Sequence, residues 1–297
     1  MLASFNIGAP KGAEQDIPGD RRLVLKGSLA ALAAAGGLAG PTITLAQDGG
    51  PTDTQILNFA LNLEYLEAEF YLRAATGQGL TAAETSGSVG TQGSVKGGSQ
   101  VPFEHDFVAN MAAEIAADER AHVNFLRAAL GANAVAEPQI NFTDAFNILA
   151  QAAGLGSTFD PFANETNFII GAFVFEDVGV TAYKGAAPLL DSKAILAQAA
   201  GILAVEAYHA GIIRTLIAQR GLDSFANKIS AVRDQLDGNP KNQDMGTQVK
   251  GQQNLVPTNQ FGVAYDRTAT EVLGIVYAGG KANNFGFFPS KLNGSIR

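Results

Sequence analysis

Two short segments of the chain carry residue types and a spacing that suit metal ions. In "LAVEAYHAGIIR", Glu206 and His209 stand three positions apart within an otherwise apolar run. In "DERAHVNFL", Glu119 and His122 have the same spacing. Residues three apart share one face of a helix, so each pair presents a carboxylate and an imidazole in the same direction. Because burying an uncompensated charge is costly, these pairs need a partner that balances them.

Two further glutamates are each followed by a tyrosine seven positions later. Glu64 precedes Tyr71 and Glu176 precedes Tyr183, and none of the other 11 glutamates has a tyrosine at this distance. Seven residues make about two helical turns, so each tyrosine shares a face with its glutamate. Glu67 lies about one turn after Glu64 and is an alternative to it as a ligand.

Four long helices must position these residues. Apolar periodicity, capping residues and breakers predict them over residues 53–77, 102–130, 162–187 and 192–221. Along each helix, steps of four and three trace a seam that is apolar except for one glutamate and one histidine or tyrosine. A long connection, residues 132–161, separates the second helix from the third. The chain is therefore predicted to be all-α, a four-helix bundle with one long crossover connection.

Four carboxylates and two imidazoles in one core match two divalent cations. The cations carry four positive charges, which balance the carboxylates, while neutral imidazoles supply nitrogen lone pairs. Di-iron and di-manganese bundles use this set, one Glu from each of two helices and Glu-x-x-His from the other two. The predicted ligands are Glu64, Glu119, His122, Glu176, Glu206 and His209. The alternative is a set of hydrogen-bonded buried polar residues that fix helix register.

Several other polar residues are predicted to lie outside this site. Asp177 points about 100° away from its neighbour on the helix, and Asp118 lies off the seam and is expected to be solvated. His105 stands about 21 Å along the helix from the site, at a helix start on the surface. Arg127 and Arg214 either pair with carboxylates at the edge of the core or lie on the surface, and the sequence leaves both open.

The composition excludes several classes of function. The chain of 297 residues has a formal charge of −8 and no evident basic patch, which argues against nucleic acid as a partner. It has no cysteine, so disulfides, thiol chemistry and thiolate-bound iron are excluded. A site without a second redox centre favours self-contained chemistry with a small oxidant. Carboxylate-rich sites suit iron and manganese, and the sequence does not choose between them.

The N-terminal segment resembles a twin-arginine export signal. Arg21 and Arg22 precede "LVLK" and a short apolar run, and small residues up to Ala46 form a plausible cleavage site. The apolar run is too short for a permanent membrane span. Residues 1–46 are therefore predicted to be a signal peptide, and the protein is expected to use the twin-arginine export machinery and to be periplasmic or extracellular.

The rest of the chain is divided into a bundle and an extension. The bundle is predicted over residues 47–222, with a Gly/Ser/Thr-rich loop insertion at residues 77–101. The C-terminal extension, residues 223–297, contains a helix, Gly/Asn-rich stretches and the aromatic segment "FGFF". Because such a segment would expose a large apolar patch in water, the extension is expected to pack on the bundle.

The sequence resembles the ferritin-like superfamily. More narrowly, "LNFALNLEYLEAEFY", "DERAHVNFLRAALG", "VEAYHAG" and the C-terminal "DRTATEVLGIVYAGGKANNFGFFPSKLNG" resemble exported bacterial relatives of the desiccation-related protein PCC13-62 group. The resemblance covers roughly residues 53–294. It implies a metal site at the six residues named above, with Tyr71 and Tyr183 beside the ligands.

Two classes of function follow from this resemblance. The first is a di-metal oxidoreductase, catalase-like or ferroxidase-like, that reacts with hydrogen peroxide, dioxygen or ferrous ion under oxidative or desiccation stress. The second is a non-catalytic protective protein of dry conditions, with a structural metal or none. The sequence does not decide between them, and it leaves a homo-oligomer open.

Overall fold

The computed structural model of the chain describes residues 50–241, 243–280 and 286–297. The predicted signal peptide, residues 1–46, lies outside the described residues. The described chain is mostly helical. Its longest helices are α2 (Asp53–Thr76), α4 (Asp106–Leu130) and α8 (Lys193–Gln219). The other helices are α3 (Ala82–Thr85), α5 (Phe142–Ala152), α6 (Glu165–Ala172), α7 (Glu176–Ala186), α9 (Asp223–Leu236) and α10 (Ala269–Val276), with 3₁₀ turns at Gly131–Asn133 and Ala187–Leu189.

Helix α2 begins and ends where its local sequence dictates. The Thr52 hydroxyl accepts from the backbone N–H of Gln55, and the Gln55 side chain accepts from the backbone N–H of Thr52 at 2.8 Å, so two orphan donors are satisfied. Gly77 ends the helix with φ of 77°, a conformation that favours glycine. Leu61, Tyr65, Phe70 and most other side chains of α2 are buried, so it is a central helix.

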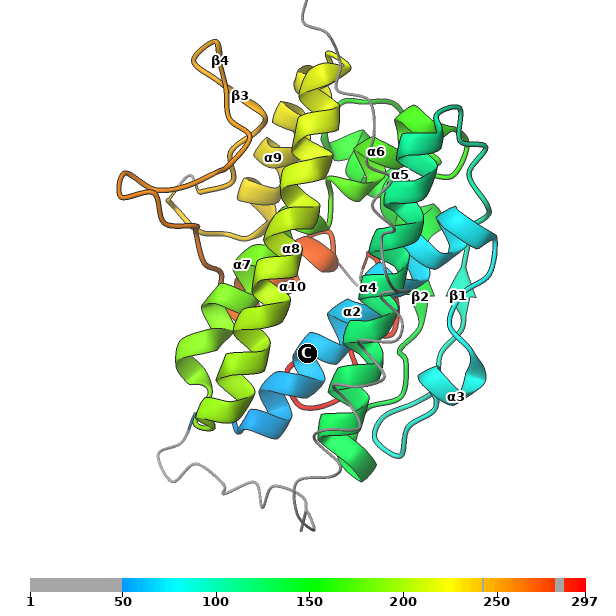
Figure 1. Ribbon diagram of the computed structural model, residues 1–297, viewed down its shortest axis with the longest axis vertical. Helices are drawn as coiled ribbons and strands as arrows, with labels where there is room; N and C mark the ends of the chain where they lie inside the picture. The colour runs from blue at the N-terminus through cyan, green and yellow to red at the C-terminus, as the bar shows by residue number, and fades with distance from the viewer. Residues whose placement is uncertain (1–49, 242, 281–285) are drawn as a thin grey trace, which may run out of the picture. The chain divides into compact units, whose positions relative to one another are not determined.

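Four of the helices pack in two pairs. Helix α2 lies along α4, and α7 lies along α8 (Figure 1). The seams predicted from the spacing are buried in both helices that carry a Glu-x-x-His pair. In α4 and α8 the buried seam residues are Val108, Ala112, Ile115, Glu119, His122, Leu126, Ala199, Ile202, Glu206, His209, Ile213 and Leu216. Removal of this apolar surface from water is the main stabilising term for such a bundle.

The third predicted helix is not continuous, which corrects the prediction of one helix over residues 162–187. It is divided into α6 and α7, and residues 173–175 between them form turns. Val174 N–H donates to Gly171 C=O and Phe175 N–H donates to Ala172 C=O, so the spacing tightens from four residues to three. Glu176 is therefore the first residue of a new helix.

The connection between α4 and α6 contains structure of its own. Residues 131–164 hold a 3₁₀ turn, β2 (Ile140–Asn141) and α5. Strand β2 pairs in parallel with β1 (Val95–Lys96), which lies in the segment that was predicted to be a loop. That segment also contains α3. A second small sheet pairs β3 (Gln248–Val249) with β4 (Gln252–Gln253) in antiparallel fashion.

Part of the C-terminal segment belongs to the hydrophobic core. Phe287 and Phe288 are fully buried. The Phe287 ring centroid lies 5.1 Å from that of Phe146 on α5 and 4.9 Å from that of Phe175, the last residue before α7. These are edge-to-face contacts, which aromatic rings prefer. The remaining phenylalanine of "FGFF", Phe285, lies outside the described residues.

One buried carboxylate joins three helix ends. Glu165, at the start of α6, accepts hydrogen bonds from the backbone N–H groups of Glu104 and His105, both at 2.9 Å. It also contacts the His105 ring at 2.7 Å and Arg220 at 2.5 Å. His105 is the N-cap residue of α4. It therefore helps to join the helix ends and lies outside the predicted metal site.

Helix α8 is the only helix among the described residues that is long and apolar enough to cross a membrane, with a mean hydropathy of 1.3. Only 28% of this apolar stretch is buried, and α8 packs one face against α7. A single such helix is weak evidence for a membrane span. The finding alone therefore does not place the chain in a membrane.

Candidate metal centre

Helices α2, α4, α7 and α8 each contribute a carboxylate to one buried cluster. Glu64 comes from α2, Glu119 from α4, Glu176 from the first position of α7 and Glu206 from α8, and each is at most 2% exposed. His122 and His209, from α4 and α8, are 8% and 4% exposed. The structure thus brings together the six residues that the sequence singled out.

The cluster divides into two groups that share one residue. Ligand atoms of Glu64, Glu119, His122 and Glu206 lie within 4.8 Å of one another, and so do those of Glu176, Glu206 and His209. Each group is small enough for one metal ion to contact all of its members. Because Glu206 belongs to both groups, its carboxylate stands between the two candidate positions.

Both histidines turn Nδ1 toward the carboxylates. His122 Nδ1 lies 3.2 Å from Glu64, 3.4 Å from Glu119 and 3.5 Å from Glu206. His209 Nδ1 lies 3.0 Å from the other oxygen of Glu119 and 3.8 Å from Glu176. The two rings therefore point into the same cluster rather than to opposite sides of the bundle. Neutral imidazole nitrogens in this position are ordinary metal ligands.

The two predicted tyrosines hold carboxylates across the bundle. Tyr71 of α2 donates to Glu176 of α7, and Tyr183 of α7 donates to Glu64 of α2. Each tyrosine therefore donates to the glutamate of the other helix. The sequence spacing had placed it beside the glutamate of its own helix. The crossed hydrogen bonds fix the orientation of both carboxylates.

Glu67 lies close to the cluster but belongs to neither group of ligand atoms. It is buried, and its carboxylate lies near Gly179 of α7. A Cβ atom at Gly179 would lie 2.3 Å from a Glu206 oxygen and 3.5 Å from a Glu67 oxygen. A larger residue at this position would therefore displace the Glu206 carboxylate. Of the two α2 glutamates, Glu64 is the one whose carboxylate oxygen belongs to a group of ligand atoms.

The cluster has hydrogen-bonding capacity that the protein itself does not use. Nine buried side-chain nitrogen and oxygen atoms of the described residues lack a partner in hydrogen-bonding geometry, and six of them belong to the cluster, although His209 Nδ1 and a Glu119 oxygen lie 3.0 Å apart. The six are both oxygens of Glu119, both oxygens of Glu206, Glu176 Oε2 and His209 Nδ1. Buried polar atoms are rarely left unpaired because each costs about 1–3 kcal/mol. Their concentration at one point fits metal ions as the missing partners.

Burial changes the protonation of the carboxylates. It raises the pKa of Glu64 to about 7 and that of Glu176 to about 8, against the partial opposition of His122 and His209. Burial and the neighbouring carboxylates also raise the pKa values of Glu206 and Glu67 well above their usual range. Without metal ions, the cluster therefore limits its negative charge by keeping protons.

The pKa shifts of Glu119 and of the two histidines favour the charged forms of these side chains. Burial disfavours the charge of Glu119, but His122 and His209 outweigh this and lower its pKa. Burial likewise disfavours charge on the rings. The surrounding carboxylates outweigh it, raising the pKa of His122 well above its usual value and that of His209 to about 10. Protons on the rings thus supply positive charge that metal ions would replace.

Asp118 contacts the cluster, which corrects the prediction that it is merely solvated. Its Oδ2 atom lies 3.2 Å from His209 Nε2, the ring nitrogen that faces away from the carboxylates. The Asp118 side chain is 41% exposed, so the contact lies at the edge of the site. A carboxylate on the outer nitrogen of a histidine fixes the ring orientation and makes the inner nitrogen a better ligand.

Replacement of Asp118 by alanine is expected to weaken binding of Mn²⁺ by about tenfold. This is the lower end of the effect of such outer contacts, because water screens a partly exposed carboxylate. Asp118→Asn keeps an acceptor oxygen and should retain most of the affinity. Calorimetric titration of both variants with Mn²⁺ at pH 7 tests this. Equal affinity of Asp118→Ala and the unchanged protein would show that the contact does not matter.

The other polar residues near the core have structural partners. Arg214 is fully buried and donates to Asp177 at 2.7 Å. Of the two positions that the sequence left open for Arg214, it therefore occupies the one paired with a carboxylate. Arg127 donates to the Tyr65 hydroxyl at 2.6 Å. Asp177 also pairs with Arg233 of α9 at 2.9 Å, a contact that spacing within one helix could not indicate.

The fold and the buried cluster together define a helical protein with a carboxylate–histidine centre. The model of the ferritin-like domain matches residues 52–219, more than half of the chain. The chain therefore belongs to the ferritin-like family, and the predicted resemblance is confirmed.

Two curated relatives are similar over most of their length. The desiccation-related protein PCC13-62 of Craterostigma plantagineum is 31% identical over 244 residues, 75% of this chain and 77% of that protein. The ferritin-like catalase Nec2 of Nesocodon mauritianus is 26% identical over 264 residues, 82% of this chain and 84% of that protein. No solved structure matches the chain significantly.

Proposed function

We propose that this protein binds two divalent metal ions, iron or manganese, and uses them to react with hydrogen peroxide or dioxygen. The six ligands would be Glu64, Glu119, His122, Glu176, Glu206 and His209. The observation that carries the proposal is the buried cluster, with six side-chain atoms that lack partners. In the same proposal the four helical segments form a ferritin-like bundle, with residues 131–164 as the crossover.

The donor set favours iron and manganese over zinc, because it contains four carboxylates and only two imidazoles. A bound pair of such ions would supply two redox equivalents to a small oxidant at one place. Peroxide disproportionation is the favoured reaction, because Nec2, a relative over most of the chain, is named a ferritin-like catalase. The absence of cysteine supports this choice, because the chain holds no thiolate centre to pass electrons on.

The residues around the cluster would prepare the site for this chemistry. Tyr71 and Tyr183 fix two carboxylates by hydrogen bonds. Buried apolar neighbours such as Ala68, Ala112 and Ile202 keep bulk water out of the core. A dry site strengthens the attraction between carboxylates and cations and holds the ligands in place before the ions arrive.

A second candidate function is protective and not catalytic. The 31% identical relative is named for desiccation, and its name attributes no reaction to it. In this case the metal ions would only stabilise the bundle. Stabilisation by a bound ion follows from mass action and needs no turnover.

Metal analysis and turnover assays separate these functions. The protein is isolated from its native exported pool and analysed for iron and manganese, and then assayed for oxygen release from peroxide and for oxidation of ferrous ion. Two ions per chain with peroxide turnover support the first function. Bound ions that raise the melting temperature without either turnover support the second. A chain that binds neither ion contradicts the metal site itself.

Export by the twin-arginine machinery is part of the proposal, because this route carries folded proteins with their cofactors. Replacing Arg21 and Arg22 by lysine keeps the charge and removes the arginine pair. The variant is expected to remain in the cytoplasm, as fractionation would show. Normal export of the variant would contradict this route.

A further inference from the structure

The interruption between α6 and α7 frees backbone carbonyl groups in the core. In a continuous helix the C=O of Val174 would accept from the N–H of Val178. That N–H instead donates to Phe175 C=O at 2.7 Å. Phe173 and Val174 are buried, so water cannot satisfy their carbonyls. A buried carbonyl without a donor is destabilising, so this interruption needs a donor from elsewhere in the chain.

Arg233 of α9 supplies that donor. Its Nη1 atom lies 2.5 Å from the Phe173 oxygen and 3.4 Å from the Val174 oxygen. The guanidinium also lies over the Phe173 ring, 4.6 Å from its centroid. Arg233 is only 1% exposed, so these contacts are made in the core. A planar guanidinium suits this role because it donates in several directions at once.

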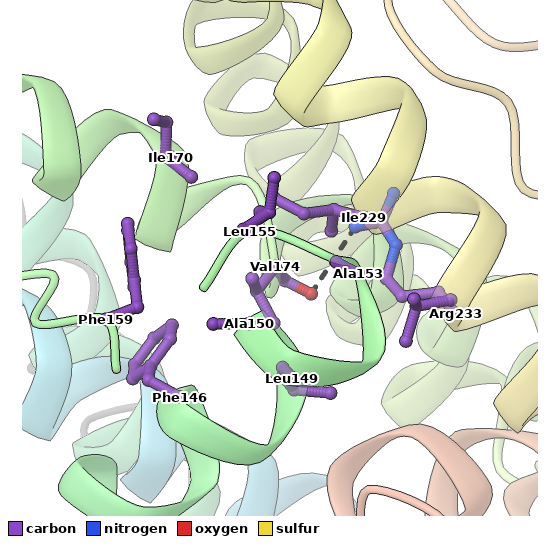
Figure 2. A pocket seen from close by; sticks show the side chains of 11 residues that line it. Phe146, Leu149, Ala150, Ala153, Leu155, Phe159, Ile170, Val174, Ile229 and Arg233 are labelled. Atoms are coloured by element: carbon purple, nitrogen blue, oxygen red, sulfur yellow. Dashed lines mark hydrogen bonds between the residues drawn. The ribbon is translucent and has the colours of Figure 1, made fainter. Parts of the chain in front are cut away.

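The neighbouring cavity offers no other polar side chain for the carbonyls. Figure 2 shows the bond from Arg233 to the Val174 oxygen, at the edge of a pocket between α5, α6 and α9. Arg233 is the only polar residue that lines it; the others are Phe146, Leu149, Ala150, Ala153, Leu155, Phe159, Ile170, Val174, Ile229 and Val232. Loss of Arg233 would therefore leave the freed carbonyls without a donor from the pocket.

The same arginine is fixed to α7 by ion pairs. Its Nη2 atom lies 2.9 Å from Asp177 Oδ2 and 2.7 Å from Asp244 Oδ1. Asp177 is the second residue of α7 and directly follows Glu176. Asp177 is also held by Arg214 of α8, at 2.7 Å. The first turn of α7 is thus held by arginines from two other helices.

A third arginine, Arg267, joins these ion pairs into a network that reaches the C-terminal segment. Arg267 donates to Asp244 at 2.8 Å, to Asp237 at 3.1 Å and to the Thr181 hydroxyl of α7 at 2.9 Å. All three arginines are at most 2% exposed, and the three aspartates balance their charge. Breaking one member of such a buried network leaves an uncompensated charge, so the network favours a single arrangement.

We propose that Arg233 is a positioning residue for Glu176. It stabilises the interruption at residues 173–175 and the Asp177 side chain, and so fixes the turn at which Glu176 enters the cluster. Glu176 and Asp177 are neighbours that point about 100° apart, one toward the cluster and one toward the network. Helix α9 therefore shapes the site although it contributes no ligand. That Glu176 binds a metal ion rests on the proposed function.

The test compares Arg233→Gln with Arg220→Gln. Arg233→Gln leaves one buried negative charge uncompensated and should lower the melting temperature. Asp177 and Asp244 keep Arg214 and Arg267 as partners, so the fold should survive, as circular dichroism would show. The affinity of Arg233→Gln for one of two Mn²⁺ ions is expected to fall at least tenfold, as for other residues that orient ligands. Hydrogen exchange at residues 173–179 should become faster in the metal-free protein. Arg220→Gln removes an ion pair at the bundle end and should leave both measurements unchanged.

A purely structural role for Arg233 would give a different result. The melting temperature would fall in that case too, but folded Arg233→Gln would bind two Mn²⁺ ions with unchanged affinity and exchange normally at residues 173–179. That result would overturn the proposal. If Arg233→Gln does not fold, Arg233→Lys, which keeps the charge without the planar geometry, takes its place with the same expectations. If the unchanged protein binds no Mn²⁺, the proposed function fails, and the exchange experiment alone decides the role of Arg233.

Discussion

Glu206→Gln is expected to fold normally and to lose at least one of two metal ions. Glu206 is the residue that both groups of ligand atoms share, and neither of its carboxylate oxygens has a hydrogen-bond partner. An amide has nearly the same shape as a carboxyl group but binds a hard cation much less well. Loss of one negative charge between two cations therefore weakens at least one position.

The fold should survive because the surroundings of Glu206 in the metal-free protein favour its neutral form. Burial and the surrounding carboxylates raise its pKa well above the usual range, so the protonated side chain resembles glutamine in size and charge. The substitution thus changes little until metal ions displace the proton. We expect unchanged circular dichroism, an unchanged melting temperature without metal, and a smaller increase in melting temperature with Mn²⁺.

Glu137→Gln is a matched control for this experiment. Glu137 is 3% exposed, has one oxygen without a partner, and has a pKa that burial raises to about 8. It lies outside both groups of ligand atoms. The control should bind two ions with the affinity of the unchanged protein. Equal metal content and equal melting shifts in Glu206→Gln and the unchanged protein would remove Glu206 from the proposed ligands.

The helices that carry the Glu-x-x-His pairs could be predicted because their apolar periodicity is local. The seams of α4 and α8 follow steps of four and three, and these residues are buried in the structure. The interruption at residues 173–175 could not be predicted in this way. The surrounding sequence is apolar and contains no proline. What stabilises the interruption is Arg233, sixty residues further along the chain.

The composition of the cluster could be predicted because it needs only helical spacing and charge balance. Asp118 was missed because its partner, His209, belongs to another helix. With Nδ1 facing the carboxylates, the His209 ring extends Nε2 outward to the edge of α4, where Asp118 lies. An aspartate directly before the glutamate of a Glu-x-x-His pair was the available signal. Its meaning depends on how α4 and α8 meet, which no single helix specifies.

The stability of the metal-free protein is expected to fall between pH 5.5 and pH 8. Glu64 and Glu176 have pKa values of about 7 and about 8 in the folded protein, above the value of 4.5 for a free glutamate. Their stabilising effect is complete below the unfolded pKa and is lost as pH rises through the folded one. His209, raised from 6.5 to about 10, acts in the same direction. Each such group contributes about 1.4 kcal/mol per pH unit within its window.

Metal ions should counteract the loss of stability with rising pH, because they bind the deprotonated carboxylates and neutral imidazoles. The increase in melting temperature that Mn²⁺ produces is therefore expected to grow from pH 5.5 to pH 8, with release of protons on binding. Melting curves with and without Mn²⁺ at pH 5.5, 6.5 and 7.5 test this, and the difference between them cancels the titration of groups such as Glu137. In Glu206→Gln the Mn²⁺ effect should depend less on pH, because glutamine has no carboxyl proton for the ions to displace. A Mn²⁺ effect that is the same at all three pH values would mean that the ions bind elsewhere than at the buried cluster.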